Sequence, residues 1–182
     1  MADTSRTQSD LLTNLFQDGQ ADGSITAQDM RDLIVSLTPS SATGRFTSNV
    51  VFTIGTADTW TGASSGTSEI ITGTSDIDMP QDGRIRYTGS IARYFSVMIS
   101  LSAIVGGNNQ DLEFRITLNG TGRPESVMQR SWNTGTDEGS LTLIDGFVIN
   151  QNDYIELEAK NDTSTNDITV VNAAIVLNGH LI

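Results

Sequence analysis

Residues 16–34 have the spacing of a calcium-binding loop between two short helices. In an EF-hand alignment, Asp18 takes the first loop position, a glycine takes the sixth and Asp29 takes the last. Gln20 stands at the third position, where an acid or Asn is typical, and Asp29 is shorter than the Glu that supplies two oxygens to Ca²⁺. Because the same glycines also suit a plain helix-turn-helix hairpin, we expect a structural turn and no metal, with calcium at Asp18–Asp29 as the alternative.

The stretch GASSG at residues 62–66 matches the G-x-S-x-G pattern of hydrolase nucleophiles. That pattern requires a buried strand before the serine and a helix after it, whereas these residues lie in the small, polar run 55–76. The single histidine, His180, would have to complete a Ser-His-Asp triad alone. The 22 acids offer carboxylate pairs for glycoside hydrolysis, and Trp60 and Trp132 can stack on sugars, but no pair stands out by its context. We therefore expect no enzyme, no catalytic residue and no cofactor.

The charge and composition exclude several classes of protein. The formal net charge is −12, so the chain repels phosphate backbones and we expect no nucleic-acid partner. No apolar run approaches the roughly 18 residues of a membrane span, so we expect no membrane partner. The first ten residues lack the basic-then-apolar pattern of a signal peptide, which favours synthesis in a cytoplasm. The absence of cysteine excludes disulfides and thiolate metal sites.

Two short segments before residue 38 carry apolar residues at helical spacing. The first contains Leu11, Leu12, Leu15 and Phe16, and the second contains Met30, Leu33, Ile34 and Leu37. Thr26 and Asp29 have the spacing of a capping box at the start of the second helix. Each helix has only about two to three turns and is too short to be stable alone in water. Their apolar faces must therefore dock, either on the domain that follows or on another protein.

The remainder of the chain alternates apolar and polar residues with a period of two, which is typical of strands with one buried face. Turn signals rich in Gly, Asn and Asp separate these stretches. We therefore predict a mainly β fold, an antiparallel sandwich of the jelly-roll type. The run 55–76 is an exposed loop or a loosely paired edge. The predicted strands are 46–54, 84–88, 94–104, 111–119, 126–132, 140–149, 153–161 and 168–177.

The strand at 94–104 has large side chains on both faces. Phe95, Val97 and Ile99 begin its inward series, while Tyr94, Met98 and Ile104 fall on the opposite face. Such side chains are large for a face in water, although scattered apolar residues are also normal on surfaces. We interpret Tyr94, Met98 and Ile104 as residues of an interface between subunits.

Three stretches resemble virion proteins of tailed bacteriophages. The phrase DLLTNLFQDGQADGSITAQDMRDLIVSL at residues 10–37 is similar to a short module at the front of head-decoration, head-fibre and tail-fibre proteins. GRIRYTGSIARYFSVMISLS (83–102) and NQNDYIELEAKNDTSTNDITVVNAAIVL (150–177) resemble the trimeric jelly-roll domains of such proteins, which are related in shape to tumour-necrosis-factor-like sandwiches. The resemblance implies a helical anchor hairpin at 1–44 and a trimerising jelly roll at 45–182.

The resemblance also implies a function without chemistry. A homotrimer on the outer capsid surface of the virion would contact several copies of the major capsid protein at once and stabilise the shell. The residues expected to contact the capsid are Leu11, Leu12, Leu15, Phe16, Met30, Leu33 and Ile34. The alternative is a receptor-binding tip of a head or tail fibre, whose partner would be a ligand on the host surface. The number of copies per virion discriminates between a decoration protein and a fibre.

Overall fold

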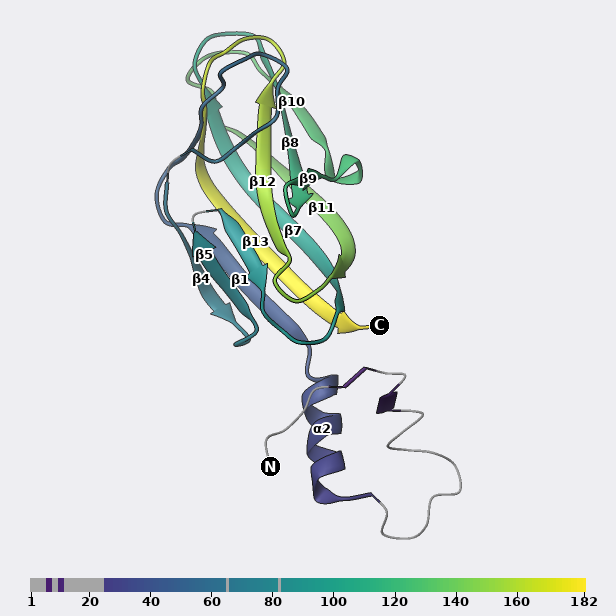
Figure 1. Ribbon diagram of the computed structural model, residues 1–182. Coiled ribbons are helices and arrows are strands. Elements are labelled where there is room, and N and C mark those ends of the chain that lie inside the picture. Colours follow the sequence, from purple (N-terminus) through teal and green to yellow (C-terminus); the bar gives the residue numbers. More distant parts are fainter. Residues whose placement is uncertain (1–5, 8–9, 12–24, 65, 82) are drawn as a thin grey trace.

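Two antiparallel sheets pack face to face, and one helix projects from an end of the sandwich (Figure 1). The structure, a computed structural model, describes residues 6–7, 10–11, 25–64, 66–81 and 83–182. Most of the first predicted helix, including Leu12, Leu15 and Phe16, lies outside the described residues. None of the helices in the described part of the chain has the length and apolar character needed to cross a membrane.

The helix α2 (Ala27–Leu37) begins at the predicted capping box. The Thr26 hydroxyl accepts from the backbone N–H of Asp29 at 3.1 Å, and the Asp29 carboxylate accepts from the backbone N–H of Thr26 at 2.8 Å. These reciprocal bonds satisfy two of the N–H groups that a helix leaves free at its start. The helix ends at Leu37 because Pro39 follows and disfavours helical backbone in the residue before it.

The two sheets of the sandwich are called sheet A and sheet B. Sheet A has the order β11-β7-β13-β1-β4, with β2 also paired to β13. Its strands are β1 (Ser40–Phe46), β2 (Val50–Phe52), β4 (Ser68–Gly73), β7 (Arg93–Val105), β11 (Gly139–Ile149) and β13 (Ile168–Leu181).

Sheet B has the order β10-β8-β12-β6-β5, with β3 paired to β12 and β9 paired to β8. A 3-10 turn, Pro124–Ser126, precedes β10. The strands are β3 (Thr61–Gly62), β5 (Ile77–Gln81), β6 (Arg84–Tyr87), β8 (Gln110–Leu118), β9 (Thr121–Gly122), β10 (Met128–Trp132) and β12 (Tyr154–Asn161).

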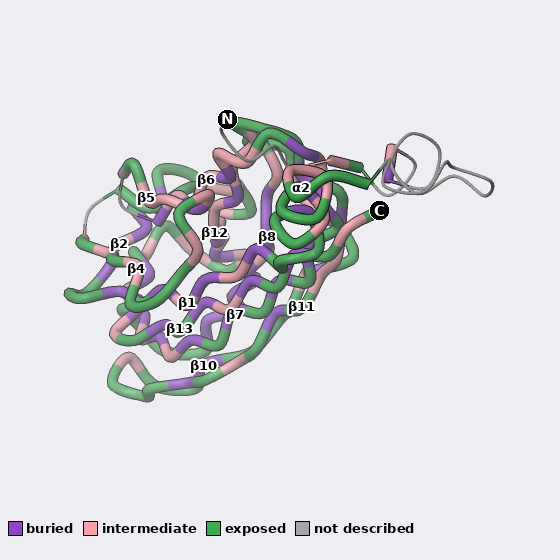
Figure 2. Tube along the Cα trace, turned by 90° about the horizontal axis from the view of Figure 1, so that it is seen from below, coloured by how far each residue is buried: buried purple, intermediate pink, exposed green. Residues whose placement is uncertain are grey.

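The strand order is that of a jelly roll, which confirms the predicted fold. The chain crosses between the sheets from β6 to β7, from β7 to β8, from β10 to β11, from β11 to β12 and from β12 to β13. These crossings produce the four-stranded sets β1-β13-β7-β11 and β6-β12-β8-β10 of two interlocked Greek keys. The core lies between them, and Figure 2 shows buried and exposed residues alternating along β7 and β13. Phe95, Val97 and Ile99 are almost fully buried there.

In the first half of the sandwich the strands begin and end at other residues than predicted. The single strand predicted at 46–54 is wrong, because a turn at residues 47–49 separates β1 from β2. Pairing with β13 is interrupted between Arg45 and Val50, while Thr47 and Ser48 in this turn bond to Thr67 on the segment that leads into β4. The run 55–76 does form a paired edge, since β4 lies at the end of sheet A. The first strand starts at Ser40, so the predicted boundary between residues 44 and 45 falls inside β1.

Candidate functional site

The outer face of sheet B is covered with ion pairs. Arg84 contacts Glu156 at 2.8 Å, Arg115 contacts Glu158 at 2.6 Å, and Lys160 lies 3.3 Å from Glu113. Burial lowers the pKa of Lys160, but hydrogen bonds from its ammonium to three carboxylates outweigh this effect and raise that pKa. The charged groups of this face are already paired with one another or solvated. Burying them against another molecule would cost desolvation free energy, so this face is a poor candidate for an interface.

Both tryptophans are already in contact with other residues of the chain. The Arg115 guanidinium lies 4.1 Å from the centre of the Trp60 ring, and the Lys160 ammonium lies 5.4 Å from it. Trp132 is buried and donates its indole N–H to the carbonyl of Ala103 at 3.0 Å. Trp132 is therefore a core residue and is not placed to stack on a sugar.

The outer face of sheet A is different, because its strands β11, β7 and β13 present no carboxylate, lysine or arginine there. The outward residues of β11, β7 and β13 are small, hydroxylated or apolar, and the charged pair of this sheet, Arg45 and Glu69, lies at the β1–β4 edge. In a chain with 22 acids this uncharged area is unusual. The outward residues are Ser140, Thr142, Ile144, Gly146, Val148, Tyr94, Ser96, Met98, Ser100, Ser102, Ile104, Thr169, Asn172, Ala174, Val176, Asn178 and His180.

A raised apolar area crosses this face where three strands meet. Ile144 pairs with Met98, and Met98 pairs with Val176, so the three side chains form one row across the sheet. Ile144, on the edge strand β11, is 66% exposed, and Met98 is 41% exposed although β7 is paired on both sides. In the next apolar row Val148 pairs with Tyr94, whose hydroxyl lies over Gly146 of β11, where an added Cβ would meet it at less than van der Waals distance. We call the five side chains of Ile144, Met98, Val176, Val148 and Tyr94 the apolar ridge.

A shallow hollow lies beside the apolar ridge on the same face. It has a volume of about 220 Å³ and exists because the outward side chains around it are small. A β-bulge in β13 between Val170 and Asn172 also interrupts the regular pairing of the sheet there. The hollow is lined by Ser100, Leu101, Ser102, Ser140, Asn172 and Ala174.

The predicted interface residues do share this face. Tyr94 and Met98 belong to the apolar ridge, and Ile104 lies half-buried near the end of the same strand. Ile144, Val148 and Val176 were not predicted to lie on this surface, although their strands were predicted. Their signal was an apolar residue at an outward position of an alternating strand, which was examined only for residues 94–104.

Helix α2 has its polar side buried and its apolar side exposed. Asp32 and Ser36 are almost fully buried, and Arg6 bonds to both: its Nε donates to Asp32 at 3.1 Å and its backbone N–H to the Ser36 hydroxyl at 2.6 Å. Met30 and Ile34 are 46% and 62% exposed. The apolar side of α2 therefore does not dock on the sandwich, while Leu33 is half-buried and Leu11 is buried.

Of the acidic loop Asp18–Asp29, which has the calcium-like spacing, the structure describes only the end that contains Asp29. The Asp29 carboxylate is engaged in the capping box, and hydrogen bonds from the hydroxyl and backbone N–H of Thr26 lower the pKa of Asp29. Among the residues that the structure describes, no three His, Asp or Glu side chains gather as a metal site would require. Asp18 and Gln20 lie outside the described residues.

The hydrolase-like residues are not arranged as a triad. Gly62 ends β3, and the next described element after it is the strand β4, where a nucleophile elbow requires a helix. Ser64 uses its hydroxyl to donate to the carbonyl of Val51 at 2.8 Å. His180 is exposed on the outer face of sheet A, paired across the ladder with Tyr94.

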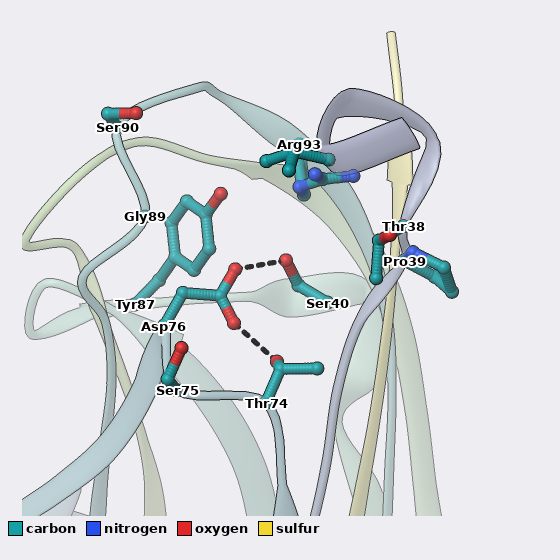
Figure 3. A pocket seen from close by; sticks show the side chains of 11 residues that line it. Thr38, Pro39, Ser40, Thr74, Ser75, Asp76, Tyr87, Gly89, Ser90 and Arg93 are labelled. Atoms are coloured by element: carbon teal, nitrogen blue, oxygen red, sulfur yellow. Dashed lines mark hydrogen bonds between the residues drawn. The ribbon is translucent and has the colours of Figure 1, made fainter. Parts of the chain in front are cut away.

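A pocket of about 410 Å³ lies where α2 meets the end of the sandwich (Figure 3). The Asp76 carboxylate accepts hydrogen bonds from the hydroxyls of Ser40 and Thr74 on one wall. Arg93, the first residue of β7, is buried on another wall, where its Nη2 donates to the carbonyl of Ser36 at 3.3 Å. The sequence analysis did not single out this site, because its residues come from four separate segments of the chain.

Comparisons with known proteins concern the fold. No protein-family model matches the chain, and no curated protein matches it. Murine APRIL at pH 5.0 is similar at 11% identity and a TM-score of 0.48, over 76% of this chain and 98% of that one. PRD1 vertex protein P5 has 10% identity and a TM-score of 0.46, over 79% and 97%. The globular domain of zebrafish complement 1qA protein has 14% identity and a TM-score of 0.33, over 79% and 97%.

Proposed function

We propose that this chain is a non-enzymatic structural protein that forms a homotrimer through the outer face of sheet A. The observation that carries the proposal is the uncharged outer face with its exposed apolar ridge, in a chain of net charge −12. Large exposed apolar areas on soluble proteins mark sites of contact, and the cores of interfaces are depleted in charge. The opposite face, covered with ion pairs, would remain in water.

The shape of this face favours a cyclic assembly. In a ring of identical subunits, one part of a surface meets a different part of the same surface on the next copy. The apolar ridge and the hollow beside it are such a pair, one raised and one recessed. Packing the ridge of one copy into the hollow of the next would bury Met98 and Ile144 against small side chains without trapping a charge.

We further propose that the trimer is a decoration, or cement, protein on the outer capsid surface of a virion. The resemblance of residues 10–37 to the front module of phage virion proteins supports this role. Met30 and Ile34 are exposed on α2 and would bind the major capsid protein, together with Leu12, Leu15 and Phe16. Three such helices in one trimer would bind neighbouring capsid subunits together, so that modest individual contacts add up to strong attachment.

Two measurements test the proposal in separate steps. Light scattering after size-exclusion chromatography should give three times the protomer mass of 19.5 kDa, and a stable monomer at micromolar concentration would contradict the trimer. Imaging of particles with and without the protein should show it in hundreds of copies on the shell; a few dozen copies would indicate a fibre tip instead.

A matched pair of variants isolates the contribution of the helix. Met30→Ser with Ile34→Ser should leave the trimer intact and abolish its binding to particles that lack the protein. Arg31→Ser, on the same exposed helix, should bind as the wild type does. Equal binding by all three proteins would contradict attachment through α2.

A further inference from the structure

The pocket between α2 and the sandwich combines an apolar wall with many groups that form hydrogen bonds. Hydroxyls come from Thr38, Ser40, Thr74, Ser75, Tyr87 and Ser90, and the two charged groups are Asp76 and Arg93 (Figure 3). Val35, Pro39 and the Tyr87 ring supply the apolar part of the wall. A few polar groups converging on an apolar wall are typical of sites for small molecules.

Arg93 is the group in this pocket that lacks a counter-charge and a full set of hydrogen-bond partners. Its residue is only 4% exposed, yet its Nε has no hydrogen-bond partner, and its one hydrogen bond goes to the neutral carbonyl of Ser36. No carboxylate of the described residues lies within ion-pair distance of the guanidinium. A guanidinium has five N–H donors in a planar fork that fits a carboxylate, and a buried charge normally has a counter-charge.

The bond to Ser36 alone gives Arg93 a structural role, because it satisfies a carbonyl in the last turn of α2. That role uses one donor and leaves the charge and the Nε–H unexplained. In the described part of the chain, the other buried side-chain atom without a hydrogen bond of good geometry is Asp162 Oδ1, and it is paired with the Lys160 ammonium at 2.9 Å. Arg93 Nε is thus the buried donor that still lacks any partner.

Asp76 restricts what the anion can be. Its two oxygens accept from Ser40 and Thr74, which fixes the carboxylate, and each oxygen keeps a second lone pair for another donor. A ligand with negative charge at both ends would be repelled by Asp76. A ligand with one carboxylate and several hydroxyls would place the carboxylate on Arg93 and donate from its hydroxyls to Asp76.

We propose that this pocket binds a small carboxylic acid that carries hydroxyl groups, such as an acidic sugar or a hydroxy acid. The volume of about 410 Å³ is near the lower end of the range for ligand pockets, roughly 300–1,000 Å³, which suits a single sugar ring. The Tyr87 ring and Pro39 offer an apolar surface against which such a ring packs. The site is independent of trimer formation, since none of its residues belongs to the apolar ridge.

The test follows the Nε–H resonance of Arg93 in ¹H–¹⁵N spectra of the full-length protein during titration. The probes are D-glucuronate, which has one carboxylate and ring hydroxyls, D-glucose, which lacks the carboxylate, and acetate, which lacks the hydroxyls. We expect D-glucuronate to move this resonance with saturation in the low-millimolar range or below, and to bind at least tenfold more tightly than either other probe. A purely structural arginine would not respond.

Variants assign the effect to the two charged groups. Arg93→Gln should weaken binding of D-glucuronate at least tenfold, and Asp76→Asn should weaken it less, while Arg45→Gln, at the opposite end of β1 from the pocket, should leave it unchanged. If Arg93→Gln does not fold, the wild-type titration and Asp76→Asn decide the question. Equal binding of D-glucose would overturn the carboxylate contact, equal binding of acetate would overturn the hydroxyl contacts, and no response to D-glucuronate would overturn the site.

Discussion

Replacing Met98 by aspartate should separate the subunits without unfolding them. Met98 lies at the centre of the apolar ridge, between Ile144 and Val176, and 41% of its surface is still exposed in the single protomer. Complete burial of a Met side chain is worth about 1.5–3 kcal/mol, so covering the remaining exposed part contributes about 1 kcal/mol per copy and about 3 kcal/mol per trimer. The Met98→Asp variant loses this contribution to the stability of the trimer.

The aspartate adds a larger cost, because its charge would be enclosed by the neighbouring copy. An unpaired buried charge costs about 3–5 kcal/mol, and three copies bring the total loss to roughly 10 kcal/mol or more. Since each 1.4 kcal/mol changes an equilibrium tenfold, the variant should be monomeric at micromolar concentration. The protomer itself should change little, because the substituted side chain faces water there.

Light scattering after size-exclusion chromatography measures the mass, and far-ultraviolet circular dichroism measures the fold. The control is Gln129→Asp, which adds the same charge to an exposed position on β10 in sheet B. We expect a folded monomer for Met98→Asp and an unchanged trimer for the control. A trimeric Met98→Asp protein would refute the assignment of this face to the interface.

Three further predictions concern the protomer. Burial raises the pKa of Asp153, but hydrogen bonds from Asn150 and Asn119 outweigh it and lower that pKa, so the carboxylate stabilises the fold above about pH 4 and this contribution is lost as the pH falls through the lowered value. Asp153→Asn should therefore cost about 1–3 kcal/mol in urea unfolding at pH 7 and progressively less below pH 4; a cost independent of pH would contradict the charged contact. Trp132→Phe removes the indole donor to a buried carbonyl of β7 and should cost about 1–3 kcal/mol, whereas an unchanged denaturation midpoint would show that the bond is replaced by water. Millimolar Ca²⁺ should not change the thermal midpoint; a large increase that is absent in Asp18→Ala would restore the calcium site.

The positions of most strands could be predicted from the sequence because alternation is a local property. Phe95, Val97 and Ile99 alternate with polar residues, and this pattern fits only a strand with one buried face. The capping box of α2 was also predictable, since Thr26 and Asp29 are three residues apart and contact each other directly. The short strands at the edge of sheet A were harder, because β4 has no fully buried residue and its pairing depends on a distant strand.

The sequence by itself determined which residues face the core and which face away, because neighbouring residues of a strand must point to opposite sides. Only the tertiary structure decided which outward residues stand together. Ile144, Met98 and Val176 come from three strands, and the register of two ladders places them in one row. The same holds for Arg93, whose burial beneath the end of α2 depends on contacts between segments far apart in the chain.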